Sequence, residues 1–299
     1  MIHLRVPATS ANLGPGFDSV SLALSLYDEV TVAPRADAIV AIDIEGFGAD
    51  ALPRDEQHLI LRSMRTAAEV FGLDLGGVGI RARNAIPQGR GLGSSAAAIT
   101  AGVAAAWMLV PGHGGLDRAA VLEVAAALEG HPDNVAACVY GGLTISWNAT
   151  GGAAAVSAEV HAGIHAELFL PPHGLSTHTA RALLPIDVAH ADAVFNVGRS
   201  ALLVHALTRA PALLLEATED RLHQPYRAAA MPESAALLGE LRRVGIAAVI
   251  SGAGPSVLAL TGPSASAVIE TVDLPTGWIR RRFAISSGLE ATEIPEVGE

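Results

Sequence analysis

The chain has 299 residues, of which 51% are hydrophobic and 16% are charged, and its formal net charge is −11. This length and composition indicate a globular protein with room for two domains, and they exclude a disordered chain. The acidic balance also excludes a broad basic surface for nucleic acid or an anionic membrane, although a small anionic ligand needs only local positive charge.

The chain contains no lysine, so all 19 of its Lys and Arg residues are arginines. A Walker-type nucleotide loop, a protein-kinase site and a Schiff-base enzyme all need a lysine. Any phosphate chemistry must therefore use backbone amides, arginine and a metal ion. The single cysteine, Cys138, cannot form an intramolecular disulfide. Since the first residues lack a signal-peptide pattern and no apolar run is long enough to span a bilayer, we expect a cytoplasmic protein.

The first half of the chain alternates between strand-like and helix-like patterns. Strands are recognised by alternating apolar residues rich in Val, Ile and Leu, and helices by apolar residues three or four positions apart. These patterns predict strands at 2–6, 19–34, 38–45, 79–84 and 143–147, helices at 58–71, 94–110 and 116–128, and a turn at 130–134.

Thr150-Gly151-Gly152 is the best candidate for a domain boundary, which would divide residues 1–151 from residues 152–299. The second half predicts strands at 154–160, 166–170, 246–250, 257–260 and 278–285, and helices at 178–184, 189–208, 232–244 and 264–272. We expect the acidic tail from Glu290 to be frayed. Because strands and helices mix without a regular alternation, the fold class is predicted to be α+β.

Three glycine-containing loops carry the strongest functional signal. One runs from Pro87 to Ala97 and opens into a helix of small apolar residues, and the others lie at 7–18 and 251–256. Glycines let the backbone approach a ligand, and the free amides at a helix N-terminus attract phosphate. The stretch Gly91–Ala96 also fits a dinucleotide-binding pattern, but Pro87 before it and the helices after it disfavour a Rossmann unit.

The three loops together resemble the signature motifs of the GHMP small-molecule kinases, in the same order and with suitable spacing. Within that superfamily the chain resembles the homoserine kinases. The segment Pro-Ala-Thr-Ser-Ala-Asn-Leu-Gly-Pro-Gly-Phe-Asp at 7–18 has the homoserine-kinase form of the first motif, and His-Pro-Asp-Asn at 131–134 resembles a substrate-side turn of that family. The resemblance covers about residues 2–285. It implies an N-terminal ribosomal-protein-like β/α domain, a C-terminal ferredoxin-like domain and an active site between them.

The resemblance also implies which residues bind ATP and magnesium. The phosphate loop would comprise Pro87, Gly89, Arg90, Gly91, Leu92, Gly93, Ser94, Ser95 and Ala96, with Gly252 and Gly254 closing the site from the second domain. Ser95 and Glu123 match the magnesium ligands of the family. A carboxylate and a hydroxyl are hard oxygen ligands of the kind that Mg²⁺ prefers.

Other matching positions surround L-homoserine in the family. The substrate-binding set is Asn12, Asp18, His131, Asn134, Thr177, Arg181 and Arg227, and the catalytic set is Asn134, Arg181 and Glu123. Arginine grips a carboxylate through paired hydrogen bonds, and Asp18 could neutralise an ammonium group. Some GHMP kinases have an aspartate base where this chain has Asn134, so the resemblance implies phosphoryl transfer without a dedicated base. Asp133 is kept only as a weak candidate for that role.

Two positions depart from the family pattern, namely Ser21 in place of a glycine and His58 in place of an asparagine on the adenine side. The resemblance further implies a homodimer. Two alternatives stay open at this stage. One is a related GHMP kinase acting on mevalonate, shikimate or a cytidyl-linked polyol, and the other is a non-catalytic ligand sensor on the same fold.

Overall fold

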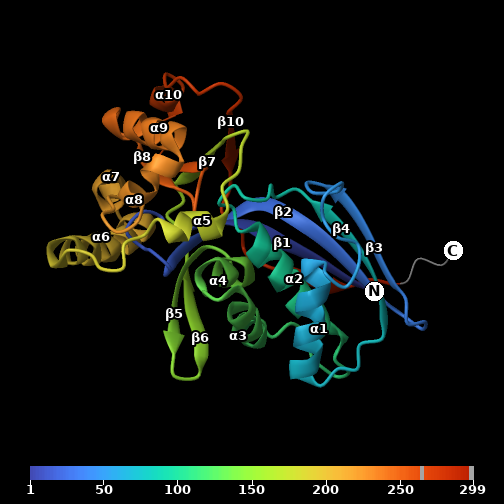
Figure 1. Ribbon diagram of the computed structural model, residues 1–299. Helices are drawn as coiled ribbons and strands as arrows, with labels where there is room; N and C mark the ends of the chain where they lie inside the picture. Colours follow the sequence, from blue (N-terminus) through green and yellow to red (C-terminus); the bar gives the residue numbers. More distant parts are fainter. Residues whose placement is uncertain (263–265, 296–299) are drawn as a thin grey trace.

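The computed structural model describes residues 1–262 and 266–295. Two sheets organise the chain (Figure 1). The larger sheet contains β1 (Ile2–Ala11), β2 (Val20–Arg35), β3 (Val40–Gly46), β4 (Gly77–Asn84), β5 (Leu143–Ala149), β6 (Gly152–Ala158) and β11 (Glu290–Glu293). The smaller sheet contains β7 (His165–Leu170), β8 (Ala247–Ile250), β9 (Val257–Thr261) and β10 (Ile279–Phe283).

The larger sheet has the strand order β11-β1-β2-β4-β3, and β5 pairs with both β2 and β6. All of its pairs are antiparallel except β3–β4. The turn at residues 150–151 joins β5 to β6, so the expected boundary after residue 151 would cut a hairpin of this sheet. Strand pairing instead places the division between β6 and β7, with β11 returning to the first domain.

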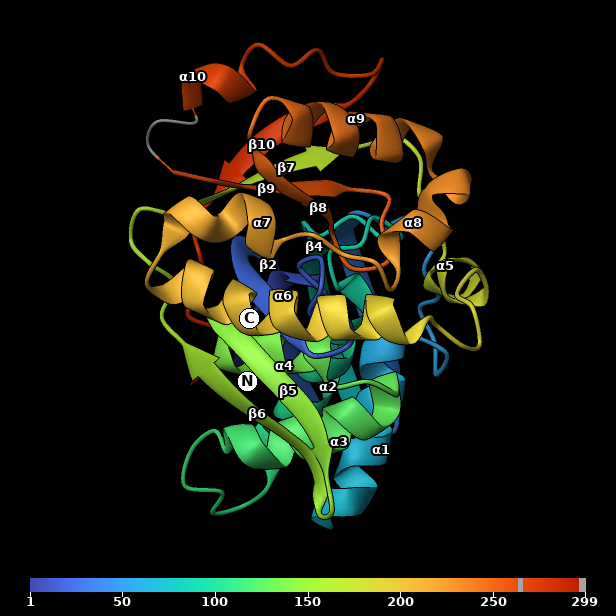
Figure 2. The ribbon, with the colours of Figure 1, turned by 90° about the vertical axis from the view of Figure 1, so that its left-hand side faces the viewer.

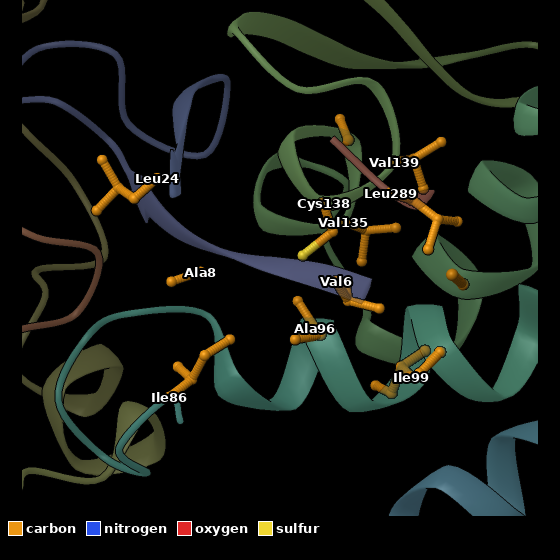
Figure 3. Close-up of a cluster of buried hydrophobic side chains, with 14 of the residues drawn as sticks. Val6, Ala8, Leu24, Ile86, Ala96, Ile99, Val135, Cys138, Val139 and Leu289 are labelled. Atoms are coloured by element: carbon orange, nitrogen blue, oxygen red, sulfur yellow. The ribbon is translucent and has the colours of Figure 1, made fainter. Parts of the chain in front are cut away.

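Four helices cover one side of the larger sheet (Figure 1). They are α1 (Leu59–Phe71), α2 (Ser94–Leu109), α3 (Arg118–Glu129) and α4 (Asp133–Tyr140). Figure 3 shows side chains of β1, α2 and α4 meeting in the core, among them Val6, Ala96 and Val135. Burying such apolar surface stabilises the fold by roughly 25 cal/mol per Å².

Helix α2 is buried on nearly every side because its residues are mostly small. A side chain at Gly102 would lie 2.3 Å from the carbonyl oxygen of Ile60, so this glycine lets α1 pack closely against α2. The left-handed Gly93 precedes the helix, and Ser94 is its first residue. The small residues after the glycine loop therefore fix α2, and with it the loop, inside the first domain.

The second domain packs helices on both faces of the smaller sheet (Figure 2). Its helices are α5 (Thr177–Ala182), α6 (His190–Thr208), α7 (Leu214–Ala217), α8 (Gln224–Arg227), α9 (Pro232–Arg243) and α10 (Ser266–Ile269), with 3-10 turns at Pro211–Leu213 and Ala228–Ala230. Strand β8 alternates between the two cores. Ala247 and Val249 join the core shared with the first domain, whereas Ala248 and Ile250 pack with α9.

The predicted elements are largely present, but the short helices α7 and α8 were not predicted, β1 continues to Ala11 instead of ending at residue 6, and three further points differ. The predicted turn at 130–134 runs into α4, which begins at Asp133 and which the sequence patterns missed. Residues 290–293 of the tail are not frayed, because β11 pairs with β1 and Glu290 accepts a hydrogen bond from Arg5 at 2.7 Å, and residues 296–299 lie outside the described residues. The expected helix at 264–272 is α10 over part of its length, and residues 264 and 265 lie outside the described residues.

Candidate active site

A cavity of about 350 Å³ lies between the two domains. The first domain contributes Ser94 and Ser95 at the start of α2, and the polar residues Glu129 at the end of α3, His131 after it and Asn134 in the first turn of α4. The second domain contributes Thr177, Arg181, Arg227, Gly252 and Ala253. The cavity therefore brings together residues as far apart in the chain as Asn12 and Ala253.

One wall of the cavity is the loop that precedes α2. Gly89, Gly91 and Gly93 have φ angles of +65°, +70° and +67°, which side-chain-bearing residues rarely adopt. These turns bring the loop to the first turn of α2, whose amides lack partners inside the helix and carry partial positive charge. The wall thus has the geometry of a phosphate site at a helix N-terminus.

The three glycine loops hold one another in place. Ser251 Oγ donates to Gly91 O at 2.7 Å and lies 2.8 Å from Ser10 Oγ, so one hydroxyl joins all three loops. A side chain at Gly91 would lie 2.1 Å from the carbonyl oxygen of Ser251. Asn12 Nδ2 adds a bond of 2.8 Å to Gly252 O. Close backbone contact between the domains therefore requires the glycine at position 91.

Two arginines and one aspartate lie at the other end of the cavity. Arg181 and Asp18 form a two-pronged ion pair with distances of 2.8 and 3.1 Å, and this hydrogen-bonded pairing raises the pKa of Arg181. Arg227 is only 1% exposed, and among the described residues no carboxylate lies within ion-pair distance of it. Its partners are the neutral atoms Ala180 O, His223 Nδ1 and Gly252 O. A buried cation without a counter-ion is costly unless an anion binds there.

The turn between α3 and α4 contributes an imidazole, a carboxylate and an amide. His131 Nδ1 lies 2.7 Å from Asp133 Oδ1, and the same oxygen accepts the backbone N–H of Asn134 at 2.8 Å. The contact with Asp133 is the main cause that raises the pKa of His131. Thr9 Oγ1 donates to Asn134 Oδ1 at 2.7 Å. Asp133 therefore orients its two neighbours, and the amide of Asn134 is tied to the first glycine loop.

Ser95 meets a carboxylate that the sequence patterns did not single out. Ser95 Oγ donates to Glu129 Oε1 at 2.7 Å, and both residues line the cavity. Burial raises the pKa of Glu129, while the bond from Ser95 opposes that shift. The hydroxyl and the carboxylate present the kind of hard oxygen pair that Mg²⁺ binds.

Comparison with known proteins places this geometry in a family. The family model described as the GHMP kinases N terminal domain matches residues 58–142, and the one described as GHMP kinases C terminal matches residues 199–273. A homoserine kinase of Streptomyces coelicolor is 54% identical over 95% of this chain and 92% of the relative. The chain belongs to the homoserine kinase family of GHMP kinases.

Solved structures support the assignment of this chain to the homoserine kinase family. A crystal structure of homoserine kinase from Cytophaga hutchinsonii superposes with a TM-score of 0.83 at 26% identity, covering 97% of each chain. A putative homoserine kinase from Listeria monocytogenes has a TM-score of 0.78 at 29% identity, covering 99% of this chain and all of the other. The predicted resemblance and the two-domain α+β fold are confirmed.

Most of the site residues expected from the homoserine kinase resemblance do meet in one cavity. Those that line it are Asn12, Asp18, Gly89, Gly91, Leu92, Gly93, Ser94, Ser95, His131, Asn134, Thr177, Arg181, Arg227 and Gly252. Those that do not line it are Pro87, Arg90, Ala96, Gly254 and Glu123. Arg90 instead donates to the carbonyl oxygens of Pro171 and Pro172, which ties the loop to the second domain.

Of the expected magnesium pair, Ser95 lines the cavity and Glu123 does not. Glu123 is an exposed residue of α3 beside Gly152 in the β5–β6 hairpin. Glu129 lies six positions further along the same helix, which turns its side chain about 120° away from that of Glu123. The signal that could have found Glu129 is its place directly before Gly130-His131, where α3 ends at the cavity.

The cavity continues from the glycine loop into a more apolar end. This end is lined by Asp28, Val30, Leu52, His58, Leu59, Ile60, Asn84 and Ala97. His58 is buried, its Nδ1 has no hydrogen-bond partner, and burial lowers its pKa. Asp28 accepts the backbone N–H groups of Ala85 and Ile86 through one oxygen, and burial raises its pKa to about 6. The apolar walls and the few buried polar groups at this end suit a flat heterocycle with polar edges.

The described residues contain no helix long and apolar enough to cross a membrane. They also contain no group of three or more His, Cys, Asp or Glu side chains placed to hold a metal ion. A metal at Ser95 and Glu129 would therefore have to complete its shell with ligand oxygens and water.

Proposed function

We propose that this chain transfers the γ-phosphoryl group of ATP to the hydroxyl of L-homoserine, giving O-phospho-L-homoserine. The observation that carries the proposal is a single cavity with a helix N-terminus at one side and the buried Arg227 guanidinium at the other, which has no carboxylate within ion-pair distance among the described residues. The first suits a phosphate chain and the second suits the carboxylate of an amino acid. The activity named for the family relatives supports this pairing of ligands.

The two ligands would lie at opposite sides of the turn that contains Asn134. The base of ATP would enter the apolar end, and its phosphates would follow the loop from Gly89 to Ser95. Arg227 would bind the carboxylate of L-homoserine. The carboxylate of Asp18, which is paired with Arg181, would bind the ammonium group. Holding the hydroxyl in line with the γ-phosphorus lowers the barrier mainly by alignment.

Mg²⁺ fits the donor set of Ser95 Oγ and Glu129 Oε1, which are hard oxygen atoms already 2.7 Å apart. When bound there it would supply charge neutralisation to the phosphates. The chain's own residues would do the rest. The amides at the start of α2 would stabilise negative charge, and Arg181 would add positive charge beside the acceptor.

We infer that no side chain acts as a dedicated base. An amide such as Asn134 cannot take a proton, and Asp133 Oδ1 is occupied by His131 and by the backbone N–H of Asn134. The bond from the substrate oxygen to the γ-phosphorus forms as the bond to the bridging oxygen breaks, and the hydroxyl proton passes to the transferred phosphoryl group. Asn134→Ala should then impair turnover more than Asp133→Asn, which keeps the size and Oδ1 of the side chain.

The deciding experiment measures magnesium-dependent ADP release with L-homoserine, mevalonate, shikimate and galactose in parallel. Two truncated acceptors sharpen it, namely 3-aminopropan-1-ol, which lacks the carboxylate, and 4-hydroxybutyrate, which lacks the amine. We expect turnover of L-homoserine alone among the full-sized acceptors, and a larger loss without the carboxylate than without the amine. Turnover of another acceptor but not of L-homoserine would refute the substrate assignment, and binding without any turnover would favour a ligand sensor.

The proposal includes the homodimer and the cytoplasmic location that the family resemblance and the sequence pattern predict. Light scattering of the purified chain at micromolar concentration tests the first, and a mass equal to one chain would contradict it.

A further inference from the structure

Arg227 is held in place by three neutral acceptors. Its Nε donates to Ala180 O at 3.2 Å, and its Nη1 lies 3.2 Å from His223 Nδ1 and 3.4 Å from Gly252 O. The guanidinium also lies over the ring of Phe17, 5.4 Å from its centroid. These contacts orient a buried positive charge without cancelling it.

His223 provides a directional contact whose protonation state can be deduced. A guanidinium only donates hydrogen bonds, so Nδ1 of His223 must be the acceptor in its contact with Arg227. A carbonyl oxygen only accepts, so Nε2 must carry the proton and donate to Gly14 O at 2.8 Å. The ring is therefore neutral and protonated on Nε2, because a charged imidazole would have no acceptor for Arg227.

The surroundings of His223 favour this neutral ring. The side chain is fully buried and stacks on Phe17 with ring centroids 5.1 Å apart. Burial is the main cause that lowers the pKa of His223, and the positive charge of Arg227 acts in the same direction. Asp220, whose Oδ2 lies 3.5 Å from Nε2, and Asp18 act in the opposite direction. Asp220 is itself occupied by the backbone N–H groups of residues 222–224.

The chain places His223 one helical turn before Arg227, at the start of α8. Residues four positions apart lie on the same face of a helix, so the two side chains meet without distortion. The carbonyl of Gly14 belongs to the first glycine loop. The imidazole therefore links that loop of the first domain to an arginine of the second.

We propose that His223 is a positioning residue that aims Arg227 at the carboxylate of the acceptor substrate and leaves the charge of the guanidinium available to it. This inference rests on the proposed function for the identity of the acceptor. A carboxylate at position 223 would orient the arginine equally well but would neutralise it. A neutral acceptor gives orientation together with an undiminished charge.

The kinetic test compares His223→Phe with His223→Gln in the complete chain. Phenylalanine keeps the aromatic stacking but has neither the donor nor the acceptor, whereas the amide of glutamine offers both. Losing one hydrogen bond to a charged group should raise the KM for L-homoserine about tenfold or more in His223→Phe. The KM for ATP and kcat should stay within about threefold of the parent, and His223→Gln should restore the KM for L-homoserine to within the same range.

A second measurement does not depend on turnover. Long-range ¹⁵N–¹H correlation spectra of the imidazoles, assigned with His223→Gln, should show His223 neutral and protonated on Nε2 at pH 7. A charged ring, or one protonated on Nδ1, would overturn the inference whatever the substrate is. So would an unchanged KM for L-homoserine in a folded His223→Phe, or equal losses toward both substrates. If the parent chain does not phosphorylate L-homoserine, the proposed function fails, and the spectra still decide whether His223 has the required form.

Discussion

The two ends of the cavity are built from different parts of the chain. The phosphate end is backbone, formed by three left-handed glycines and the first amides of α2. The acceptor end is side chain, formed by Asp18, Arg181 and Arg227 from three separate segments. A site built from backbone should lose function when a side chain is added to one of its glycines. A site built from side chains should tolerate added atoms but lose function when a charge is removed. Substitutions in the two parts should therefore impair function in different ways.

Gly91→Ala should have the largest effect. The new methyl group would lie 2.1 Å from Ser251 O, so the three loops could not keep their contacts. We expect ATP-dependent turnover to fall at least about 1000-fold, since preorganised donors of this kind contribute about 10²–10³ each. Gly89→Ala is the matched control, because its φ is also left-handed but its nearest contact would be 3.6 Å. Equal losses in the two variants would show that backbone strain, not close approach, sets the requirement.

Glu129→Gln should reduce kcat about 100-fold and raise the magnesium concentration needed for half-maximal activity, because a charged ligand is lost. Glu123→Gln, on the exposed side of the same helix, should match the parent. Burial raises the pKa of Glu129, so the parent should lose activity on acidification at a higher pH than an ordinary glutamate would cause. A magnesium titration with each variant checks this, and a defect confined to Glu123→Gln would reverse the assignment.

Arg227→Met should lower kcat/KM for L-homoserine about 100-fold, because charge-assisted bonds to the carboxylate are lost. Its free energy of unfolding should change by less than about 2 kcal/mol, because the cost of burying an unpaired charge disappears with the bonds. Urea unfolding and steady-state kinetics on the same preparation separate the two effects. The exposed Arg209→Met serves as the control. A large loss of stability with unchanged kinetics would make Arg227 a structural residue.

Asp28→Asn should change the free energy of unfolding by an amount that depends on pH. The pKa of Asp28 is about 6 in the folded chain against an ordinary value of 3.8. A carboxyl whose pKa is raised on folding stabilises the protein below its ordinary pKa, and that contribution is lost as pH rises through 6. Asn keeps the acceptor oxygen for Ala85 and Ile86. We therefore expect Asp28→Asn to gain about 2–3 kcal/mol at pH 8 and little at pH 4 in denaturant titrations. Equal effects at both pH values would contradict the raised pKa.

The sequence predicted the backbone end of the site better than the side-chain end. A run of glycines and serines before an apolar helix is itself typical of a loop at a helix N-terminus. The structure has this geometry, because Gly93 adopts a left-handed conformation and Ser94 begins the helix. The roles of Arg181 and Arg227 came only from resemblance, because an arginine in a sequence looks the same whether it is exposed or buried. Burial of Arg227 depends on packing between α8 and segments more than 40 residues away.

The choice between Glu123 and Glu129 shows a second limit. Both glutamates lie on α3, and only the rotation of that helix against α2 decides which one reaches Ser95. His223 was missed for a similar reason, because its importance lies in a contact with Gly14, more than 200 residues earlier in the chain. The predicted domain boundary at residue 151 falls in the β5–β6 hairpin, because a Gly-rich turn has the same composition in a hairpin as in a linker.

The pairing of β11 with β1 makes the second domain an insert within the first sheet rather than an appendage to it. One edge of β1 stays without its partner until residues 290–293 have been made, so during synthesis on the ribosome the first sheet has an open edge while most of the chain emerges. Folding of the first domain is therefore completed last, by its final strand. A chain shortened after β6 would keep the glycine loop at 87–97 but would expose that edge permanently, and we expect it to aggregate.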